Sequence, residues 1–341
     1  MHGDRDVPDC LCANLCLDRH LGCCHLDRDA YGSGYWRRWG VGRFGSPGDG
    51  VVAPSWAAGV GRLLAPIRRP LAADVLASDT LHVDDTPVPV LEPAAGKTKT
   101  GRLWTYVRDE RPFAGARPPT ALFFYSPDRK GEHPQAHLKD FRGVIHADGY
   151  AGFNELFVGG RIVEAGCWAH VRRKFFDVHA ATGSPIAKEA LDRIGQLYAV
   201  EKTINRSPPD RRRQQRQLQS KPIAEALAAW ADTTVRRLSR KSELAQTFRY
   251  MRARWTALVR CFDDGRLARD NNPAERALRC VAIGRKNYLF AGSDAGGRCA
   301  AAIYSLIETA KLNGLNPQHY IADVLARIAD HPARRIAQLL P

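Results

Sequence analysis

Residues 270–279 read DNNPAERALR, and this stretch predicts the start of an amphipathic helix. Asn272 is a good N-cap residue, and Pro273 suits the first helical position, where a backbone N–H is dispensable. Apolar residues then recur with helical spacing and form one face. The residues of this face are Ala274, Ala277, Leu278 and Val281.

Glu275 lies off the apolar face, near the positive end of the expected helix. Two interpretations of this carboxylate are open. It can be a metal ligand fixed on a rigid element beside Asn271 and Asn272. It can also be the third position of a capping box, with Arg279 as its i+4 ion-pair partner. The rest of the chain has to decide between them.

The composition indicates a soluble globular protein with a polyanionic partner. At 341 residues, the chain can bury one large core or two moderate cores. Lys and Arg (51) exceed Asp and Glu (36), which gives a net charge of +15 and favours nucleic acid as the partner. No stretch approaches the roughly 20 apolar residues of a membrane span, and residues 1–4 begin no signal peptide. We therefore expect a cytoplasmic protein without a membrane partner.

Residues 1–50 differ from the rest, because they show no sustained helical or strand periodicity. Five of the nine cysteines fall within residues 10–24. Their spacing matches no CxxC pair, so a poorly ordered leader is favoured over a zinc site. Without a secretory signal, reduced thiols are the default. The potential zinc ligands are Cys10, Cys12, Cys16, His20, Cys23, Cys24 and His25.

The next part of the chain has an α/β pattern. Residues 51–79 are expected to form a helical lead-in, and a short helix is expected near residues 137–141. Because Pro87 and Pro89 cannot donate to a ladder, the later part of the first strand should be bulged or at an edge. The expected strands are residues 81–91, 103–107, 120–125, 144–148 and 162–165.

From residue 170 to residue 265 the pattern is almost entirely helical, with a break at residues 207–209. We interpret this region as a helical insertion between the fifth strand and the helix of Glu275. A short extended segment is expected at residues 284–290. A helix should follow Gly296-Gly297 and end at Asn313-Gly314, and residues 314–341 should form a helical tail with a last helix after Pro317.

Three acids stand at informative positions. Asp84 interrupts an apolar strand, where a charge is unfavourable unless it binds something. Asp148 ends another strand, and Glu275 opens a helix. Such acids suit Mg²⁺ or Mn²⁺, and two ions about 4 Å apart promote in-line attack on a phosphodiester. The alternative is three unrelated acids, each solvated or paired.

Six motifs occur together and in one order. They are LHVDDTPV at residues 81–88, GRLW at 101–104, HADGY at 146–150, CWAHVRRKF at 167–175, DNNPAER at 270–276 and GRKN at 284–287. This set resembles the transposase of the insertion sequence 66 family, a DDE-type enzyme of bacterial mobile elements. The resemblance runs from about residue 55 to the last residues of the sequence.

The resemblance implies an RNase H-like mixed-sheet core, formed by residues 80–169 and 266–313 and interrupted by the helical insertion. It also implies that Asp84, Asp148 and Glu275 are the catalytic, metal-binding acids, with Mg²⁺ or Mn²⁺ as cofactor. The sequence departs from the family pattern at Asp85, where the family usually has Glu. Residues 1–50 also lack the zinc-finger and helix-turn-helix character usual in the family.

The remaining candidate residues surround these acids. Cys167 and His170 supply only two ligands, so zinc is not expected there. A packed helix start beside the active site is the better interpretation, and Asn271 and Asn272 are further supporting residues. His82 and His146 each precede an acid by two residues, and ordinary packing is favoured for both. The candidate DNA contacts are Arg172, Arg173, Lys174, Arg276, Arg279, Arg285 and Lys286.

The leading hypothesis is a transposase that cleaves element ends and transfers the freed 3′-hydroxyl into target DNA. Its expected partners are double-stranded DNA, further copies of the chain bound to that DNA, and accessory proteins of the element, with nucleoid association. A second hypothesis is a catalytically incompetent, DNA-binding transposase remnant with a disrupted N-terminus. A third is a general RNase H-type nuclease, which would cleave RNA–DNA hybrids without element ends.

Overall fold

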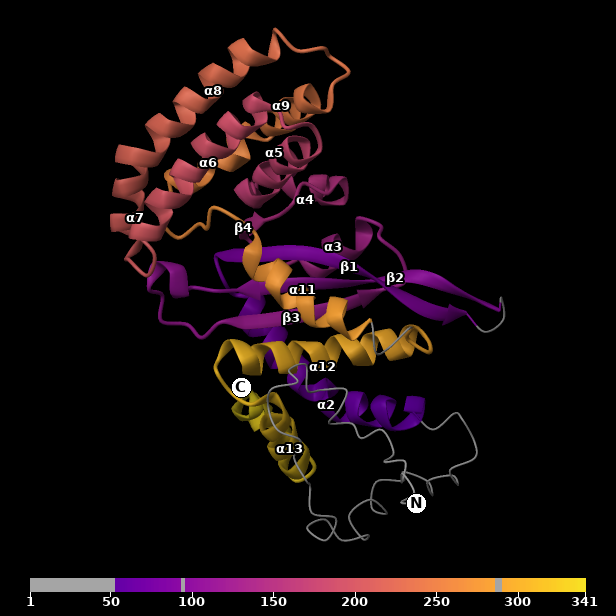
Figure 1. Ribbon diagram of the computed structural model, residues 1–341. Helices are drawn as coiled ribbons and strands as arrows, with labels where there is room; N and C mark the ends of the chain where they lie inside the picture. Colours follow the sequence, from indigo (N-terminus) through magenta and orange to yellow (C-terminus); the bar gives the residue numbers. More distant parts are fainter. Residues whose placement is uncertain (1–52, 93–95, 286–289) are drawn as a thin grey trace, which may run out of the picture.

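The computed structural model describes residues 53–92, 96–285 and 290–341 (Figure 1). The leader and its zinc candidates at residues 1–50 lie outside the described residues. So do Lys286 and most of the expected extended segment at residues 284–290. Within the described ranges, no helix combines the length and the apolar character needed to cross a membrane.

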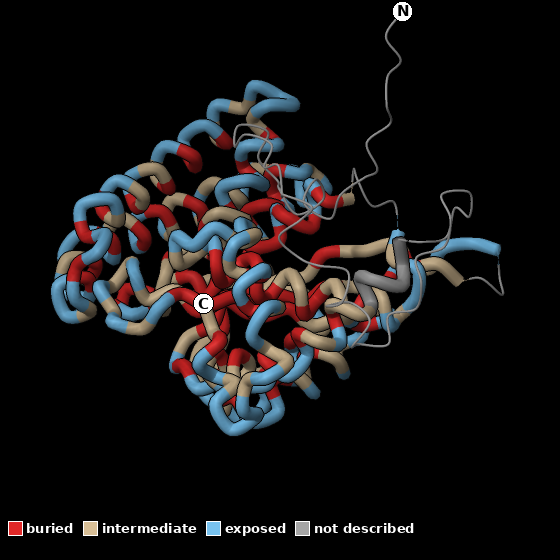
Figure 2. Tube along the Cα trace, turned by 90° about the horizontal axis from the view of Figure 1, so that it is seen from below, coloured by how far each residue is buried: buried red, intermediate tan, exposed pale blue. Residues whose placement is uncertain are grey.

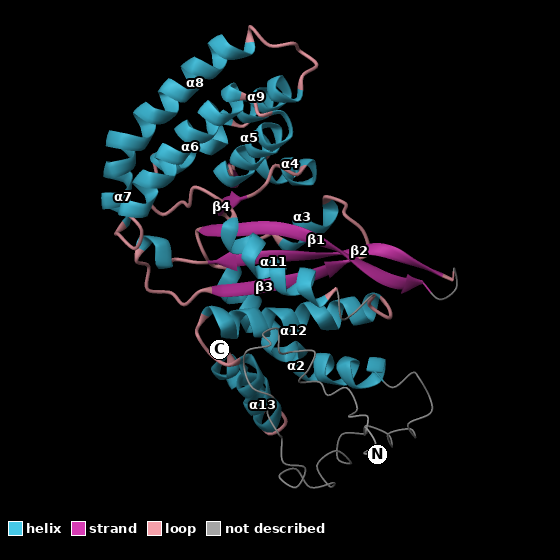
Figure 3. Ribbon diagram, in the orientation of Figure 1, coloured by secondary structure: helices cyan, strands magenta, loops and turns pink. Residues whose placement is uncertain are grey.

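A five-stranded mixed sheet forms the centre of the molecule, with the strand order β3-β2-β1-β4-β5 (Figures 1 and 3). β1 pairs antiparallel with β2 and parallel with β4, while β3 pairs antiparallel with β2 and β5 parallel with β4. The α/β expectation is confirmed. The strands are β1 Thr80–Glu92, β2 Lys97–Arg108, β3 Thr120–Ser126, β4 Gly143–His146 and β5 Ile162–Ala165.

The prolines of β1 lie beyond the short stretch in which β1 pairs with β4. β1 pairs with β4 only from Thr80 to His82. Further along, Ala291 bonds the backbone of Pro89 and of Leu91 on that same side. Odd-numbered residues of β1 therefore turn their backbone away from β2, so Pro87 and Pro89 remove no bond from the β1–β2 ladder. The edge position is as expected, but the ladder runs without a bulge.

Helices cover both faces of the sheet. α2 (Ala53–Leu76) packs on the face formed by Trp104, Tyr106 and Leu122. α11 (Asn272–Gly284) packs on the opposite face, against Leu103 and Val107. Side chains of successive strand residues point to opposite faces, which explains why neighbouring residues of β2 belong to different cores.

α12 (Asp294–Leu312) also protects the outer edge of the sheet. Ser305 Oγ accepts the N–H of Phe123 at 2.8 Å, and Thr309 Oγ1 accepts the N–H of Ala121 at 3.1 Å. Two outward-facing backbone donors of the edge strand β3 are therefore paired. α13 (Pro317–Arg327) and the 3₁₀ segment Ala333–Leu339 complete this side of the molecule (Figure 1).

Between β5 and α11 the chain is helical, and these helices lie beyond one side of the sheet (Figures 1 and 3). They have a hydrophobic core of their own, which includes Trp168, Phe175, Ile194, Leu227 and Phe248. Figure 2 shows buried residues in both regions, with exposed residues around the periphery. The helices are α5 Trp168–Thr182, α6 Pro185–Thr203, α7 Pro209–Gln215, α8 Lys221–Val235, α9 Glu243–Ala253 and α10 Trp255–Val259.

Several predicted boundaries are wrong. The short helix α3 is Glu132–His137 rather than residues 137–141. The glycines at residues 296–297 lie inside α12, because Ser293 caps the helix by accepting the N–H of Gly296. β4 ends at His146, so Asp148 lies in the following loop and not at the strand end.

Candidate active site

Asp84 lies on β1 without a cation beside it. Its Oδ1 accepts the N–H of Asp85 at 2.8 Å, and no ion pair reaches Asp84 among the described residues. Burial, together with the smaller effect of the negative charges of Asp148, Asp85 and Glu275, raises the pKa of Asp84 to about 7. The fold thus brings three acids, from three distant parts of the sequence, within electrostatic reach of one another.

Asp148 is positioned by the helical region. Its Oδ1 accepts the N–H of Tyr150 at 2.9 Å, and its carbonyl accepts the hydroxyl of Tyr250 at 3.0 Å. Arg254 donates to the carbonyl of Gly149 at 2.7 Å. Gly149 has a φ of 87°, and a Cβ there would lie 1.7 Å from Arg254 Cζ, so only glycine fits. The sequence analysis missed Tyr250 and Arg254, since nothing in their local pattern marks them.

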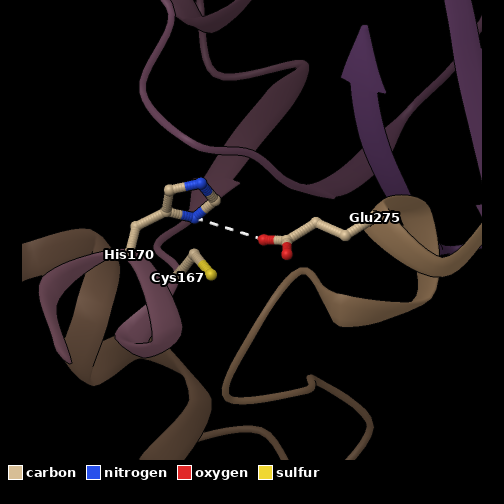
Figure 4. A group of neighbouring side chains, drawn as sticks. All are labelled: Cys167, His170 and Glu275. Atoms are coloured by element: carbon tan, nitrogen blue, oxygen red, sulfur yellow. Dashed lines mark ion pairs between the residues drawn. The ribbon is translucent and has the colours of Figure 1, made fainter. Parts of the chain in front are cut away.

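Glu275 lies in the first turn of α11 and faces α5. Its Oε1 lies 3.6 Å from His170 Nδ1, and its Oε2 lies 3.7 Å from Arg173 Nη2 (Figure 4). The capping-box interpretation is not supported, because Asn271 rather than Asn272 occupies the N-cap position. The carboxylate therefore points towards the helical region.

Asn271 joins three elements at this point, and it is fully buried. Its Nδ2 donates to the carbonyl of Val83 at 2.8 Å, and its Oδ1 accepts from His82 Nδ1 at 3.2 Å. Its backbone N–H donates to Cys167 Sγ at 3.2 Å. The predicted capping role of Asn272 was wrong because the neighbouring Asn271 takes that position and uses its side chain to attach α11 to β1.

His82 and His146 stack on each other at 4.4 Å between ring centroids. Burial lowers the pKa of His146 to about 4 and that of His82 well below its ordinary value, so both rings are neutral. Ala268 donates its N–H to His146 Nε2 at 3.0 Å. Besides packing against each other, as expected, these histidines attach the segment before α11 to β1 and β4.

Asp85, the position that departs from the family pattern, has a structural role. Arg102 lies 3.0 Å and Arg129 2.8 Å from the carboxylate of Asp85, and the Asp85 side chain is only 2% exposed. Neighbouring acids on β1 therefore have opposite surroundings. Asp85 is neutralised by two guanidinium groups, whereas Asp84 is not.

The candidate DNA contacts form two groups near Glu275. Arg172, Arg173 and Lys174 are exposed on α5, and Arg276 and Arg279 are exposed on α11. Arg285 is tied to the sheet, since its Nη2 donates to Thr86 Oγ1 at 3.0 Å.

A pocket of about 590 Å³ lies beside these groups, between α5, α6 and the start of α11. Arg172 and Arg173 line it together with Asn272, Phe176 and Tyr198. Two guanidinium groups therefore border a hollow that begins next to Glu275.

The three acids suit divalent cations in their chemistry. Their oxygens match the preference of Mg²⁺ and Mn²⁺, and their mutual repulsion at Asp84 would be relieved by positive charge. In the described part of the chain, the ligand atoms of the trio are not all within 4.8 Å of one another.

Two other groups of side chains have ligand atoms within 4.8 Å of one another. The first is Cys167, His170 and Glu275. The second is Asp128, Glu132 and His133, where His133 Nε2 already pairs with Asp128 Oδ1 at 2.7 Å.

These features define an α/β protein with three neighbouring acids, flanked by exposed arginines and a helical insertion. The model of the transposase IS66 family matches residues 42–299, and the model of the IS66 C-terminal element matches residues 305–341. The chain belongs to the IS66 transposase family.

The curated relatives include three uncharacterized proteins of Sinorhizobium fredii (strain NBRC 101917 / NGR234). Protein y4hP is 42% identical over 294 residues, which are 82% of this chain and 53% of y4hP. Protein y4qI is 36% identical over 77% of this chain and 50% of its own length, and y4jD is 36% identical over 80% and 55%. The chain thus spans about half the length of these relatives. No solved structure matches it.

Proposed function

We propose that the chain is the catalytic part of a DDE transposase, which cleaves DNA strands at the ends of an insertion sequence and transfers the freed 3′-hydroxyl into target DNA. One observation is central: the pKa of Asp84 is raised to about 7 by burial and by repulsion from Asp148 and Glu275. A buried acid with a strongly raised pKa, close to acids from distant segments, is typical of functional sites. Membership of the IS66 transposase family gives this cluster its chemical context.

The assigned roles follow from the surroundings of each acid. Asp84, Asp148 and Glu275 would hold Mg²⁺, or Mn²⁺, which supplies activation of the attacking oxygen and stabilisation of the leaving oxygen. Asn271 fixes the start of α11 on β1 and so orients Glu275. Tyr250 fixes the loop of Asp148.

Arg172 and Arg173 are assigned to DNA phosphates, since they are exposed, lie beside Glu275 and border the pocket. Lys174, Arg276 and Arg279 extend the same basic surface. Arg285 is also assigned to DNA, and its bond to Thr86 holds its side chain on the sheet. The net charge of +15 supports double-stranded DNA as the partner. Paired element ends further imply several copies of the chain on one DNA complex, accessory proteins of the element, and association with the nucleoid.

The same proposal divides the chain into an RNase H-like core at residues 80–169 and 266–313 and an insertion at residues 170–265. Residues 51–79 lead into the core, and residues 314–341 form the tail. The mixed sheet, with acids on β1, after β4 and on α11, supports this division, as does the separate hydrophobic core of the insertion.

The test is cleavage of duplex DNA carrying an element end, with Mg²⁺ or Mn²⁺, by the full chain. Asp148→Ala and Glu275→Ala should each lower the cleavage rate by about 10³-fold, because an ion loses a charged ligand at the transition state. Asp140→Ala is the matched control, since this acid is exposed and is not among the charges that act on Asp84.

Equal activity in the wild type and both alanine variants would refute the catalytic assignment. If all are inert but bind DNA with a steep salt dependence, the remnant hypothesis replaces the enzyme. Cleavage of RNA–DNA hybrids regardless of element ends would instead identify a general nuclease.

A further inference from the structure

Cys167, His170 and Glu275 meet where the insertion begins. Cys167 immediately precedes α5, His170 lies in its first turn, and Glu275 comes from the first turn of α11. Their ligand atoms all lie within 4.8 Å of one another. In Figure 4 the imidazole, the thiol and the carboxylate turn towards a common space between the two helices. Two distant segments thus supply a sulfur, a nitrogen and an oxygen to one point.

Two of these atoms are buried without a hydrogen-bond partner among the described residues: His170 Nδ1 and Glu275 Oε1. They face each other at 3.6 Å, which is longer than a hydrogen bond between nitrogen and oxygen. Leaving buried polar atoms unpaired is unfavourable, because they lose their hydrogen bonds to water without replacement. The arrangement is therefore incomplete as a hydrogen-bonded cluster.

The same distance suits two ligands of one tetrahedral ion. With metal–ligand bonds of about 2.0–2.1 Å, two nitrogen or oxygen ligands lie about 3.3–3.4 Å apart, and sulfur ligands lie slightly further out. Small adjustments of the side chains would bring all three atoms to bonding distance. The N–H of Asn271 already donates to Cys167 Sγ, the kind of supporting bond that orients metal ligands.

We propose that Cys167, His170 and Glu275 form a site for a thiophilic divalent ion, with Zn²⁺ as the best fit. Three protein ligands leave a fourth position open, as in zinc sites that bind water or a further ligand. A thiolate and an imidazole favour Zn²⁺ over Mg²⁺. Glu275 is also assigned to Mg²⁺ with Asp84 and Asp148, so its carboxylate would be shared between the two sites. The ion would join the insertion to the helix of Glu275.

Sequence reasoning argued against zinc here because it found only two ligands. The third ligand, Glu275, lies more than a hundred residues further along the chain, and only the fold reveals it. The inference goes beyond DNA cleavage, because an ion can bind here whether or not the chain cuts DNA.

The test is a titration of the reduced full chain with Co²⁺, without DNA. Cobalt replaces zinc at such sites, and a thiolate ligand gives it a charge-transfer absorption band. Four proteins are compared: the wild type, Cys167→Ala, His170→Gln and the control Cys280→Ala. Cys280 is a buried thiol on α11 that belongs to neither group of potential metal ligands among the described residues. All four proteins retain the cysteines of residues 10–24, so any Co²⁺ bound by those cysteines is the same in each and does not affect the comparison.

The wild type and Cys280→Ala should bind about one more equivalent of Co²⁺ than Cys167→Ala and His170→Gln. The wild-type spectrum minus that of Cys167→Ala should contain the thiolate band. Equal stoichiometry and equal spectra in all four proteins would overturn the site. So would displacement of this equivalent by Mg²⁺ at millimolar concentration, because that would indicate an oxygen-only site.

His170→Gln guards against misfolding, since the His170 side chain is partly exposed and its loss should be tolerated. Circular dichroism of each variant confirms the fold. Loss of DNA cleavage leaves this readout untouched, so the zinc site and the transposase proposal can fail separately.

Discussion

Two largely buried carboxylates, Asp84 in the sheet and Glu201 in the helical region, have opposite surroundings. Glu201 lies 2.8 Å from Arg212 and 2.6 Å from Arg216. Burial tends to raise the pKa of Glu201, yet hydrogen bonds and charge from these arginines hold it below its ordinary value. For Asp84, burial and neighbouring acids act in the same direction and raise the pKa to about 7.

The difference separates a structural ion-pair cluster from the site that we propose to bind cations. Around Glu201 the negative charge is paired within the chain by two guanidinium groups, and the spare donors of Arg216 reach the carbonyls of Cys261 and Leu267. Around Asp84 negative charge accumulates without a cation. Removing one partner from the first arrangement would leave a buried charge unpaired, whereas we propose that the second is relieved when a cation binds.

The largest expected effect comes from removing the carboxylate of Glu201. Glu201→Gln leaves two buried guanidinium groups without their carboxylate, and we expect it to lower the free energy of unfolding by about 3–5 kcal/mol. Chemical denaturation at pH 7 measures this value. The control is Glu189→Gln, which removes an i+4 pair with Arg193 on the surface of α6 and should change stability by about 0.5 kcal/mol or less. Equal effects of the two variants would show that Glu201 is not a structural centre.

The next effect is a pH dependence of opposite sign at Asp84. Because its folded pKa is about 7 and its unfolded pKa about 3.9, folding favours the protonated acid. Its contribution to stability is complete below pH about 4 and is lost as the pH rises through 7, by at most about 4 kcal/mol without a divalent ion.

Denaturation curves with EDTA between pH 4 and 8 test this pH dependence. Asp84→Asn should flatten the fall in stability between pH about 4 and 7, and Mg²⁺ should reduce the fall in the wild type. Curves extended below pH about 4 test Glu201, since Glu201→Gln should lack the stability that the wild type loses there because the folded pKa of Glu201 is lowered. An identical fall between pH about 4 and 7 in Asp84→Asn and the wild type would contradict the assignment of this pH dependence to Asp84.

The sequence predicts the parts of the comparison that depend on local pattern. An acid inside the apolar strand Thr80–Glu92 is visible as a break in the pattern, so Asp84 could be singled out. The α/β order and the helical insertion follow from periodicity. Glu201, Arg212 and Arg216 look like ordinary surface charges of a helix, and only packing shows that both arginines are fully buried.

The positions that pattern reasoning missed depend on contacts across the chain. Local propensity does not decide whether Asn271 or Asn272 is the N-cap of α11, since both residues are good caps. The bond from Asn271 to the carbonyl of Val83 decides it. Tyr250 and Arg254 orient the loop of Asp148 from about a hundred residues away, and nothing in the sequence marks that contact.

A smaller effect is expected at Asn271, whose hydrogen bonds hold α11 beside the acids. Asn271→Ala leaves the carbonyl of Val83 and the N–H of His82 without their partner, and should lower stability by about 2 kcal/mol. Asn272→Ala is the control one residue away. This half-exposed side chain should contribute less than about 0.5 kcal/mol.

Cleavage should fall in Asn271→Ala even below its unfolding temperature, since α11 loses its attachment beside Glu275. If Asn271→Ala were as stable and active as Asn272→Ala, the acids would be positioned by something other than this amide.

The smallest effect on stability, but a clear effect on binding, is expected at the exposed arginines of α5. Arg172 lies on the pocket side of the helix, and we expect Arg172→Ala to change the free energy of unfolding by less than about 0.5 kcal/mol. It should weaken DNA binding evenly across sequences and reduce the slope of log affinity against log salt by about 1.

The matched control is Arg334→Ala, an exposed arginine in the 3₁₀ segment Ala333–Leu339, on the other side of the sheet from α5 (Figure 1). Fluorescence anisotropy with a labelled duplex at several salt concentrations measures both slopes. A phosphate contact at Arg172 requires its slope to fall while that of Arg334→Ala stays at the wild-type value. Unchanged or equally reduced slopes would assign the basic surface of α5 to solubility, and DNA would then have to approach the uncompensated acids from another side.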